Sequence, residues 1–139
     1  MMKERICARG HQHVSAAHAS TLEVTTESFL TKAGDCIIGV DADRPPSAFA
    51  ESFIEACRTE QAQITATINV GDTETSITGT GDPRLTCAND TSAVLRTSDY
   101  VDDRTVMVNA DLAARDIDRS IIDRLRRGAE LVITLSVQS

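Results

Sequence analysis

The three histidines of the chain are close together in the sequence, at His11, His13 and His18. If His11 and His13 lie on one strand, their side chains project from the same face, where two imidazoles can share a zinc ion. His18 reaches such a site only if the chain bends. The spacing therefore allows a zinc site formed by these three residues, and the alternative is a set of surface or hydrogen-bonded histidines. Because imidazole titrates near neutral pH, proton transfer is a second chemistry open to them.

Two carboxylates follow the histidines along the chain, Glu23 and Asp35. Either could complete a metal site or act as a general base on a bound water. Asp35 follows Gly34, and turns of this kind are places where binding sites are commonly built. The candidate catalytic residues are therefore His11, His18, Glu23 and Asp35.

Arginine supplies most of the positive charge, since Lys3 and Lys32 are the only lysines. Arg84, Arg96 and Arg104 come from separate segments, and guanidinium groups that meet can bind a carboxylate or a phosphate through paired hydrogen bonds. Arg96 and Arg104 are the candidate ligand-binding residues. The alternative is a set of surface ion pairs with the many aspartates.

The four cysteines are far apart and form no Cys-x-x-Cys pair. No secretory leader is apparent, so we expect reduced thiols in a cytoplasmic protein. Cys36 enters an apolar stretch, which is typical of a buried structural thiol rather than of a nucleophile. We expect the same of Cys7, Cys57 and Cys87.

The glycine-rich segment at residues 79–83 is the nearest approach to a cofactor-binding motif. It lacks the third glycine of a dinucleotide-binding loop and the Gly-Lys-Ser/Thr ending of a phosphate-binding loop. We therefore interpret it as a turn, and no cofactor-binding residue is predicted.

Composition narrows the classes of protein to which the chain can belong. With 139 residues it has the length of a single domain, residues 1–139, and few of its 41% hydrophobic residues are aromatic, so the core must be aliphatic. The net charge of -7 disfavours nucleic acid as a partner, because phosphate backbones need basic surface. No apolar run approaches the ~20 residues of a membrane span. The Asp-rich, Lys-poor balance is typical of proteins from salt-loving archaea, with ordinary acidic solubility as the alternative.

Strand patterns cover much of the chain. Residues 62–70 and 73–79 alternate apolar and polar side chains around Gly71-Asp72, which predicts a β-hairpin. Residues 130–138 alternate in the same way. Residues 36–40 are apolar throughout, which predicts a short central strand, with Gly39 at a bulge or a close backbone approach. Shorter strands are expected at residues 4–8, 21–26, 93–97 and 104–108.

Two amphipathic helices interrupt the strands. Residues 46–58 follow a pair of prolines and place apolar side chains on one stripe. Residues 116–127 space apolar side chains four apart, carry arginines near the C-terminal end and stop at Gly128. No internal repeat is evident. The whole pattern predicts a mainly β protein of the β-rich α+β class, a single-domain antiparallel or mixed β-sandwich with two amphipathic helices.

Several segments together resemble the signature of an archaeal family known as domain of unknown function number 371. The residues that carry the resemblance are Gly10-His11-x-His13-Val14-x-Ala16-x-His18, Thr21-x-Glu23, Leu30-Thr31-x-x-Gly34-Asp35-Cys36-Ile37-Ile38-Gly39-Val40, Gly81-Asp82-Pro83, Arg96-x-Ser98, Arg104-Thr105 and Ala110-Asp111-x-Ala113-Ala114-x-Asp116-Ile117-x-Arg119. The resemblance implies a β-rich, sandwich-like fold. It also implies histidine at the positions of His11 and His18, though not regularly at His13, and it implies no activity.

Two classes of function are consistent with these patterns. The first is a small cytosolic ligand-binding domain or enzyme that takes a small molecule at a polar site around the His-rich N-terminal segment. The second is a non-catalytic interaction or assembly protein, in which sheet edges and the Arg-bearing second helix bind a protein partner or another copy of the chain. Neither class specifies a substrate, and zinc is the one cofactor that the residues suggest.

Overall fold

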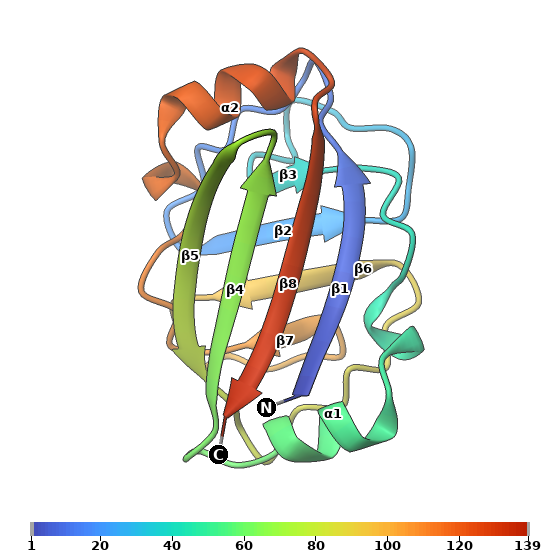
Figure 1. Ribbon diagram of the computed structural model, residues 1–139, viewed down its shortest axis with the longest axis vertical. Coiled ribbons are helices and arrows are strands. Elements are labelled where there is room, and N and C mark those ends of the chain that lie inside the picture. Colours follow the sequence, from blue (N-terminus) through green and yellow to red (C-terminus); the bar gives the residue numbers. More distant parts are fainter. Residues whose placement is uncertain (1, 139) are drawn as a thin grey trace.

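The computed structural model describes residues 2–138, which form two four-stranded β-sheets. In Figure 1 the strands of the front sheet run upright, and those of the rear sheet run across them. The front sheet is antiparallel and has the order β1-β8-β4-β5. Its strands are β1 (Met2–Arg9), β4 (Gln63–Val70), β5 (Thr73–Thr80) and β8 (Glu130–Gln138).

The rear sheet has the order β3-β2-β6-β7. Its central strands β2 and β6 are antiparallel, whereas β3 and β7 at the edges run parallel to their neighbours. The strands are β2 (Thr21–Thr25), β3 (Ile37–Gly39), β6 (Ser92–Arg96) and β7 (Thr105–Met107). The helices α1 (Glu51–Cys57) and α2 (Arg119–Arg126) lie at opposite ends of the molecule (Figure 1). This arrangement confirms the predicted β-rich α+β fold with two helices.

Both helices are shorter than predicted. A 3-10 turn at Pro46–Ala48 precedes α1, and another at Ala114–Asp116 precedes α2. Extended backbone separates each turn from its helix, at Phe49 and at Ile117. The helix α2 begins after Asp118, because that side chain accepts a hydrogen bond from Ser120 N at 2.8 Å and so caps the first turn. Across residues 2–138, no helix has the length and apolar character that crossing a membrane requires.

The predicted hairpin is confirmed as β4 and β5, joined through Gly71 with a φ of 60°. Every second side chain of β4 and of β8 is buried and faces the core. The core is almost entirely aliphatic. The largest fully buried side chains are Ile6, Leu22, Ile38, Ile64, Ile68, Ile77, Leu85, Met107, Ile122, Leu125, Leu131 and Ile133.

The prediction of a central strand at residues 36–40 is wrong in one respect, since β3 lies at the edge of its sheet. It is nevertheless buried at Ile38 and Gly39. Because neighbouring residues point to opposite faces of a strand, both faces of β3 are covered, which explains its continuous apolar sequence. At Gly39, predicted to mark a bulge or a close backbone approach, the register between β2 and β3 shifts, and side chains crowd the position, since a Cβ there would lie 2.9 Å from Leu131 Cδ2.

The chain folds as two equivalent halves, which the sequence did not predict. The series β1, β2, β3, α1, β4 is repeated as β5, β6, β7, α2, β8, and each sheet order is symmetric under exchange of the halves. Gly10 N donates to Ala129 O at 2.7 Å, and its counterpart Gly81 N donates to Ala62 O at 3.0 Å. Matching positive φ angles occur at Ala16 and Cys87, both 49°.

The two halves meet along β2 and β6. Glu23 faces Val94 across this antiparallel pair, and the two residues are also counterparts, because Glu23 N donates to Cys36 O as Val94 N donates to Arg104 O. The approximate twofold axis therefore passes between Glu23 and Val94. The side chains at this centre differ completely, so the repeated backbone carries a different chemistry in each half.

Candidate functional site

The candidate site lies on the face of the rear sheet that points away from the core. Leu22 and Val24 pack into the core, so Glu23 between them projects from the opposite face. This second face is also covered, since every residue of β6 is buried. Glu23 and Arg96 are therefore charged residues inside the protein, and both are buried.

Asp102 joins the two arginines that were predicted to bind a ligand. Its Oδ2 accepts hydrogen bonds from Arg96 Nη2 at 3.0 Å and from Arg104 Nη2 at 3.0 Å. Its Oδ1 accepts from Thr105 Oγ1 at 3.0 Å, and the same hydroxyl accepts from Arg96 Nε at 2.9 Å. Arg96 also lies 4.9 Å from the centre of the Tyr100 ring. Arg96 and Arg104 are thus brought together and held in fixed orientations.

Electrostatics keep Asp102 ionised. Burial by itself would raise the pKa of Asp102, but the hydrogen bonds from Arg104, Thr105 and Arg96 outweigh it and lower the pKa to about 2. The charge of Asp102 therefore offsets one of the two guanidinium charges over the ordinary pH range. Arg84, the third predicted arginine, lies apart from this group and pairs with Asp82 at 3.0 Å.

Glu23 has few partners for a buried carboxylate. Its Oε1 accepts a hydrogen bond from the Cys36 thiol at 3.5 Å and lies 3.9 Å from Arg104 Nη1. Thiols are weak donors, and 3.9 Å is too long for a hydrogen bond. The side chain of Glu23 is 12% exposed, which gives a small molecule limited access to the second oxygen.

Cys36 is a hydrogen-bond donor to Glu23 and not a nucleophile. Burial, followed by the nearby carboxylate of Glu23, raises the pKa of Cys36 to about 11. A hydrogen bond with Thr21 acts in the opposite direction but does not outweigh them. The thiol therefore stays protonated near neutral pH, whereas nucleophilic cysteines need a lowered pKa.

His18 uses one ring nitrogen to hold a turn. Its Nδ1 accepts hydrogen bonds from Ser20 N at 3.2 Å and Thr21 N at 3.1 Å, and it lies 3.0 Å from Thr21 Oγ1. Asp35 packs beside it through the backbone, because the carbonyl of Asp35 accepts from His18 N. His18 and Asp35 therefore support the segment that enters β2. They border the group formed by Glu23, Cys36, Arg104, Asp102 and Arg96, which we call the Glu23 group.

His11 and His13 form a separate pair. The two rings are 5.2 Å apart, and His11 Nδ1 accepts a hydrogen bond from His13 N at 3.0 Å. In the described residues, no group of three or more His, Cys, Asp or Glu side chains is arranged to hold a metal ion. Within this part of the chain the three histidines are thus not grouped as a metal site, and the zinc site that their spacing allows stays a prediction.

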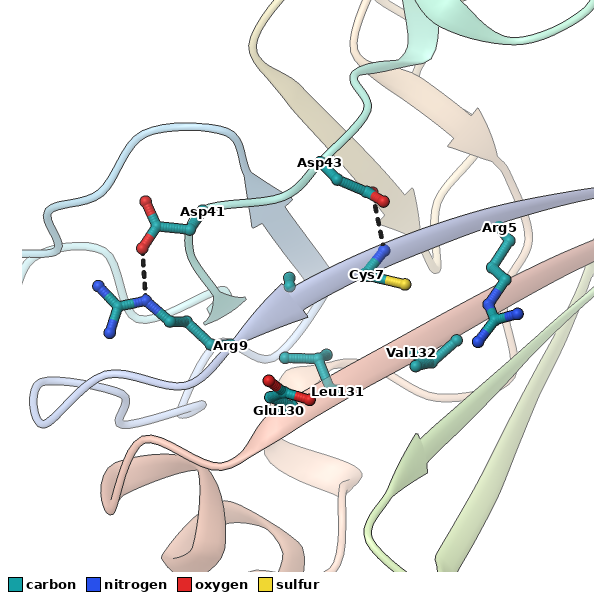
Figure 2. A pocket seen from close by; sticks show the side chains of 9 residues that line it. Arg5, Cys7, Arg9, Asp41, Asp43, Glu130, Leu131 and Val132 are labelled. Carbon is teal, nitrogen blue, oxygen red and sulfur yellow. Dashed lines mark hydrogen bonds and ion pairs between the residues drawn. The ribbon is translucent and has the colours of Figure 1, made fainter.

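A groove of about 410 Å³ lies on the other sheet, over β1 and β8 (Figure 2). Arg9 pairs with Asp41 at its rim, and Asp43 accepts a hydrogen bond from the backbone of Cys7. Both aspartates are thus engaged in holding the segment after β3 against β1. The groove contains none of the predicted site residues.

Comparison with known proteins identifies relatives of the chain. Residues 6–138 match the family model described as domain of unknown function (DUF371). The chain belongs to this family. Within it, the chain is 42% identical over 132 residues to "Uncharacterized protein MJ0206" of Methanocaldococcus jannaschii, covering 95% of this chain and 97% of the relative. The DUF371 description carries no activity, so the function must be argued from the geometry.

One member of the Glu23 group and two residues that contact Arg96 were missed in the sequence of this DUF371 protein. Asp102, Thr105 and Tyr100 contact the two arginines but were not predicted. A signal for Asp102 was present, because an aspartate side chain often accepts a hydrogen bond from the backbone N–H two residues later and so forms a turn. In the structure, Asp102 Oδ1 accepts such a bond from Arg104 N at 3.0 Å. No sequence pattern indicated that this turn would reach Arg96.

Proposed function

We propose that this DUF371 protein is a small-ligand-binding domain whose site is the group formed by Glu23, Cys36, Arg104, Asp102 and Arg96. The observation that supports it is the Glu23 carboxylate, which is mostly buried, accepts one weak hydrogen bond from a thiol and keeps some exposure to solvent. A buried carboxylate normally accepts several strong hydrogen bonds, and leaving it without them costs free energy. Glu23 has one weak bond, from a thiol. No buried side-chain oxygen in the described residues lacks a partner, so the second oxygen of Glu23 is open to solvent, and a ligand that donates an N–H group would replace water there.

The neighbouring charge indicates which ligands fit. Arg104 Nη1 lies beside Glu23, and the side chain of Arg104 is 41% exposed. Its Nε and Nη2 are engaged by Asp102, which leaves Nη1 to face an incoming oxygen. An acceptor and a cationic donor therefore lie side by side. This arrangement suits a small polar molecule with an N–H donor next to a carbonyl or carboxylate oxygen, such as an amino acid, an amide or a nucleobase.

Binding fits the site better than catalysis does. A general acid or base works best with a pKa near the operating pH. The pKa of Cys36 is raised to about 11, and that of Asp102 is lowered to about 2. Both groups are therefore fixed in one protonation state near neutral pH, as suits residues that orient a ligand.

The alternative of an assembly protein has less support. It relied on free sheet edges and on the Arg-bearing second helix. Of these, the edges are partly covered, since the segment after β3 covers part of the β1 edge, where Arg9 N donates to Val40 O at 2.9 Å. Its counterpart after β7 covers part of the β5 edge, where Thr80 N donates to Val108 O at 2.8 Å. Covered edges protect a sheet against pairing with another chain.

A native mass spectrum of untagged protein, purified without chelator, tests this proposal. Extra mass that matches an organic molecule, and that is absent from a Glu23→Gln variant purified in the same way, would support it. A mass increment equal to zinc that is lost in a His11→Ala variant would instead indicate a metal site. Bare subunits in both preparations, with no gain in mass on adding amino acids, amides or nucleobases, would count against a ligand-binding role.

A further inference from the structure

A cavity that is distinct from the Glu23 group lies beside the His11–His13 pair. Its volume is about 320 Å³. It is bounded by the segment after β1, by the loop between β2 and β3, and by the C-terminal turn of α2. The lining residues are Gln12, His13, Val14, Ser15, Lys32 and Arg126.

The charge of this lining is unusual for the chain. No carboxylate borders the cavity, although the protein has a net charge of -7. By contrast, acidic residues line the groove of Figure 2, a cavity beside α1 and a cavity over β1. Lys32, one of two lysines, and Arg126 make no ion pair within residues 2–138. Two cations and an imidazole therefore face one space without a neutralising partner.

Two of these three side chains are held in place by the fold. Arg126 Nε donates to Val14 O at 2.8 Å, which fixes the guanidinium at the cavity wall and leaves its terminal nitrogens for another acceptor. The backbone of His13 is fixed by its hydrogen bond to His11 Nδ1, and its ring packs against that of His11. Donors that are oriented in advance lose little entropy when a ligand binds.

We infer that this cavity binds a small oxyanion, such as inorganic phosphate or the phosphate group of a small metabolite. Arginine and lysine are the side chains that recognise phosphate best, the first through paired hydrogen bonds and the second as a point charge. The ligand is small, because the acidic remainder of the surface repels a nucleic acid backbone. A divalent metal on His11 and His13 does not fit this site, since Lys32 and Arg126 would repel it.

Isothermal titration calorimetry with sodium phosphate, at fixed ionic strength maintained with chloride, tests this inference. We expect saturable binding at one site in the native protein. Lys32→Ala should weaken binding about tenfold, as expected when one charge-assisted hydrogen bond is removed, and Lys32→Glu should abolish it. Lys32 is exposed, so neither variant should impair folding, and thermal unfolding checks this.

The matched control is Lys3→Ala, which removes the same charge from a different surface. It should leave phosphate binding unchanged, and so should Glu23→Gln, which separates this inference from the proposed Glu23 site. Absence of saturable phosphate binding would overturn the inference, as would equal losses in Lys3→Ala and Lys32→Ala. Binding of a single-stranded RNA oligonucleotide in the absence of phosphate binding would also overturn it, in favour of a nucleic acid surface.

Discussion

His18 and Asn89 hold the same position in the two halves of the fold. His18 Nδ1 accepts hydrogen bonds from Ser20 N and Thr21 N, and Asn89 Oδ1 accepts from Thr91 N at 2.8 Å and Ser92 N at 2.7 Å. An imidazole nitrogen and an amide oxygen thus perform the same task at the entrance to β2 and to β6. The position of His18 is therefore explained by backbone geometry before any catalytic role is invoked.

This equivalence predicts that asparagine can replace His18. His18→Asn should change the free energy of unfolding by less than about 0.5 kcal/mol, because the turn keeps its acceptor. His18→Ala should lose about 1 kcal/mol, since the N–H groups of Ser20 and Thr21 lose their partner. Urea denaturation of both variants measures the difference, and equal losses in the two would contradict the assigned role.

Asp102 should be among the most sensitive polar positions. Asp102→Asn removes the charge that neutralises Arg96, whose side chain is only 10% exposed, so we expect a loss of about 2–4 kcal/mol. Asp103→Asn is the matched control, because Asp103 is exposed and its substitution should cost less than about 0.5 kcal/mol. Similar denaturation midpoints for the two variants would show that Asp102 does not hold the arginines in place.

The lowered pKa of Asp102 also predicts a dependence of stability on pH. In the unfolded chain the carboxyl binds its proton at a higher pH than in the folded protein, where the pKa is about 2. The stabilisation is therefore complete above about pH 4 and is lost as the pH falls towards 2. Wild type should lose more stability than Asp102→Asn across this window, and parallel pH profiles would rule out the contribution.

Cys36 should react slowly with iodoacetamide in the folded protein at pH 8. Its pKa is raised to about 11 by burial and then by Glu23, so little thiolate is present. Glu23→Gln should increase the rate of alkylation several-fold, because one of these two causes is removed. Glu27→Gln, at an exposed carboxylate, should leave the rate unchanged. Peptide mapping by mass spectrometry gives the rate at Cys36 alone, and equal rates in all three proteins would exclude the coupling.

The internal symmetry predicts paired effects at two glycines. A Cβ would lie 1.9 Å from Leu125 O at Gly10 and 2.0 Å from Cys57 O at Gly81. Both contacts are with backbone, which cannot move away easily, so Gly10→Ala and Gly81→Ala should each cost about 1–3 kcal/mol or more. Gly34→Ala is a milder control, since its nearest neighbour is the flexible side chain of Leu30. A large loss at only one of the two glycines would contradict their equivalence.

The strands were predictable because their signals are local. Alternation in residues 62–70 and 130–138 needs only one buried face, and Gly71-Asp72 needs only a tight turn. The internal repeat was not predictable, because counterparts such as His18 and Asn89 make the same backbone contacts with unlike side chains. The division of each predicted helix into a 3-10 turn and a shorter α-helix was also not predictable, because the extended residue between the two leaves no periodic signal in the sequence.

The site was predicted in part. Glu23, Arg96 and Arg104 were selected by residue type, and the fold brings Glu23 close to Arg104 and joins both arginines through Asp102. Sequence spacing could not reveal this, because Glu23 and Arg104 come from opposite halves and meet only when β2 pairs with β6.

The most direct test of the Glu23 site is a thermal-shift screen of wild type, Glu23→Gln and Glu27→Gln against free amino acids, small amides and nucleobases. We expect at least one compound to raise the melting temperature of wild type and of Glu27→Gln in a saturable manner, and the shift to disappear in Glu23→Gln. A shift that survives in Glu23→Gln, or the absence of any shift in wild type, would contradict the proposed Glu23 site.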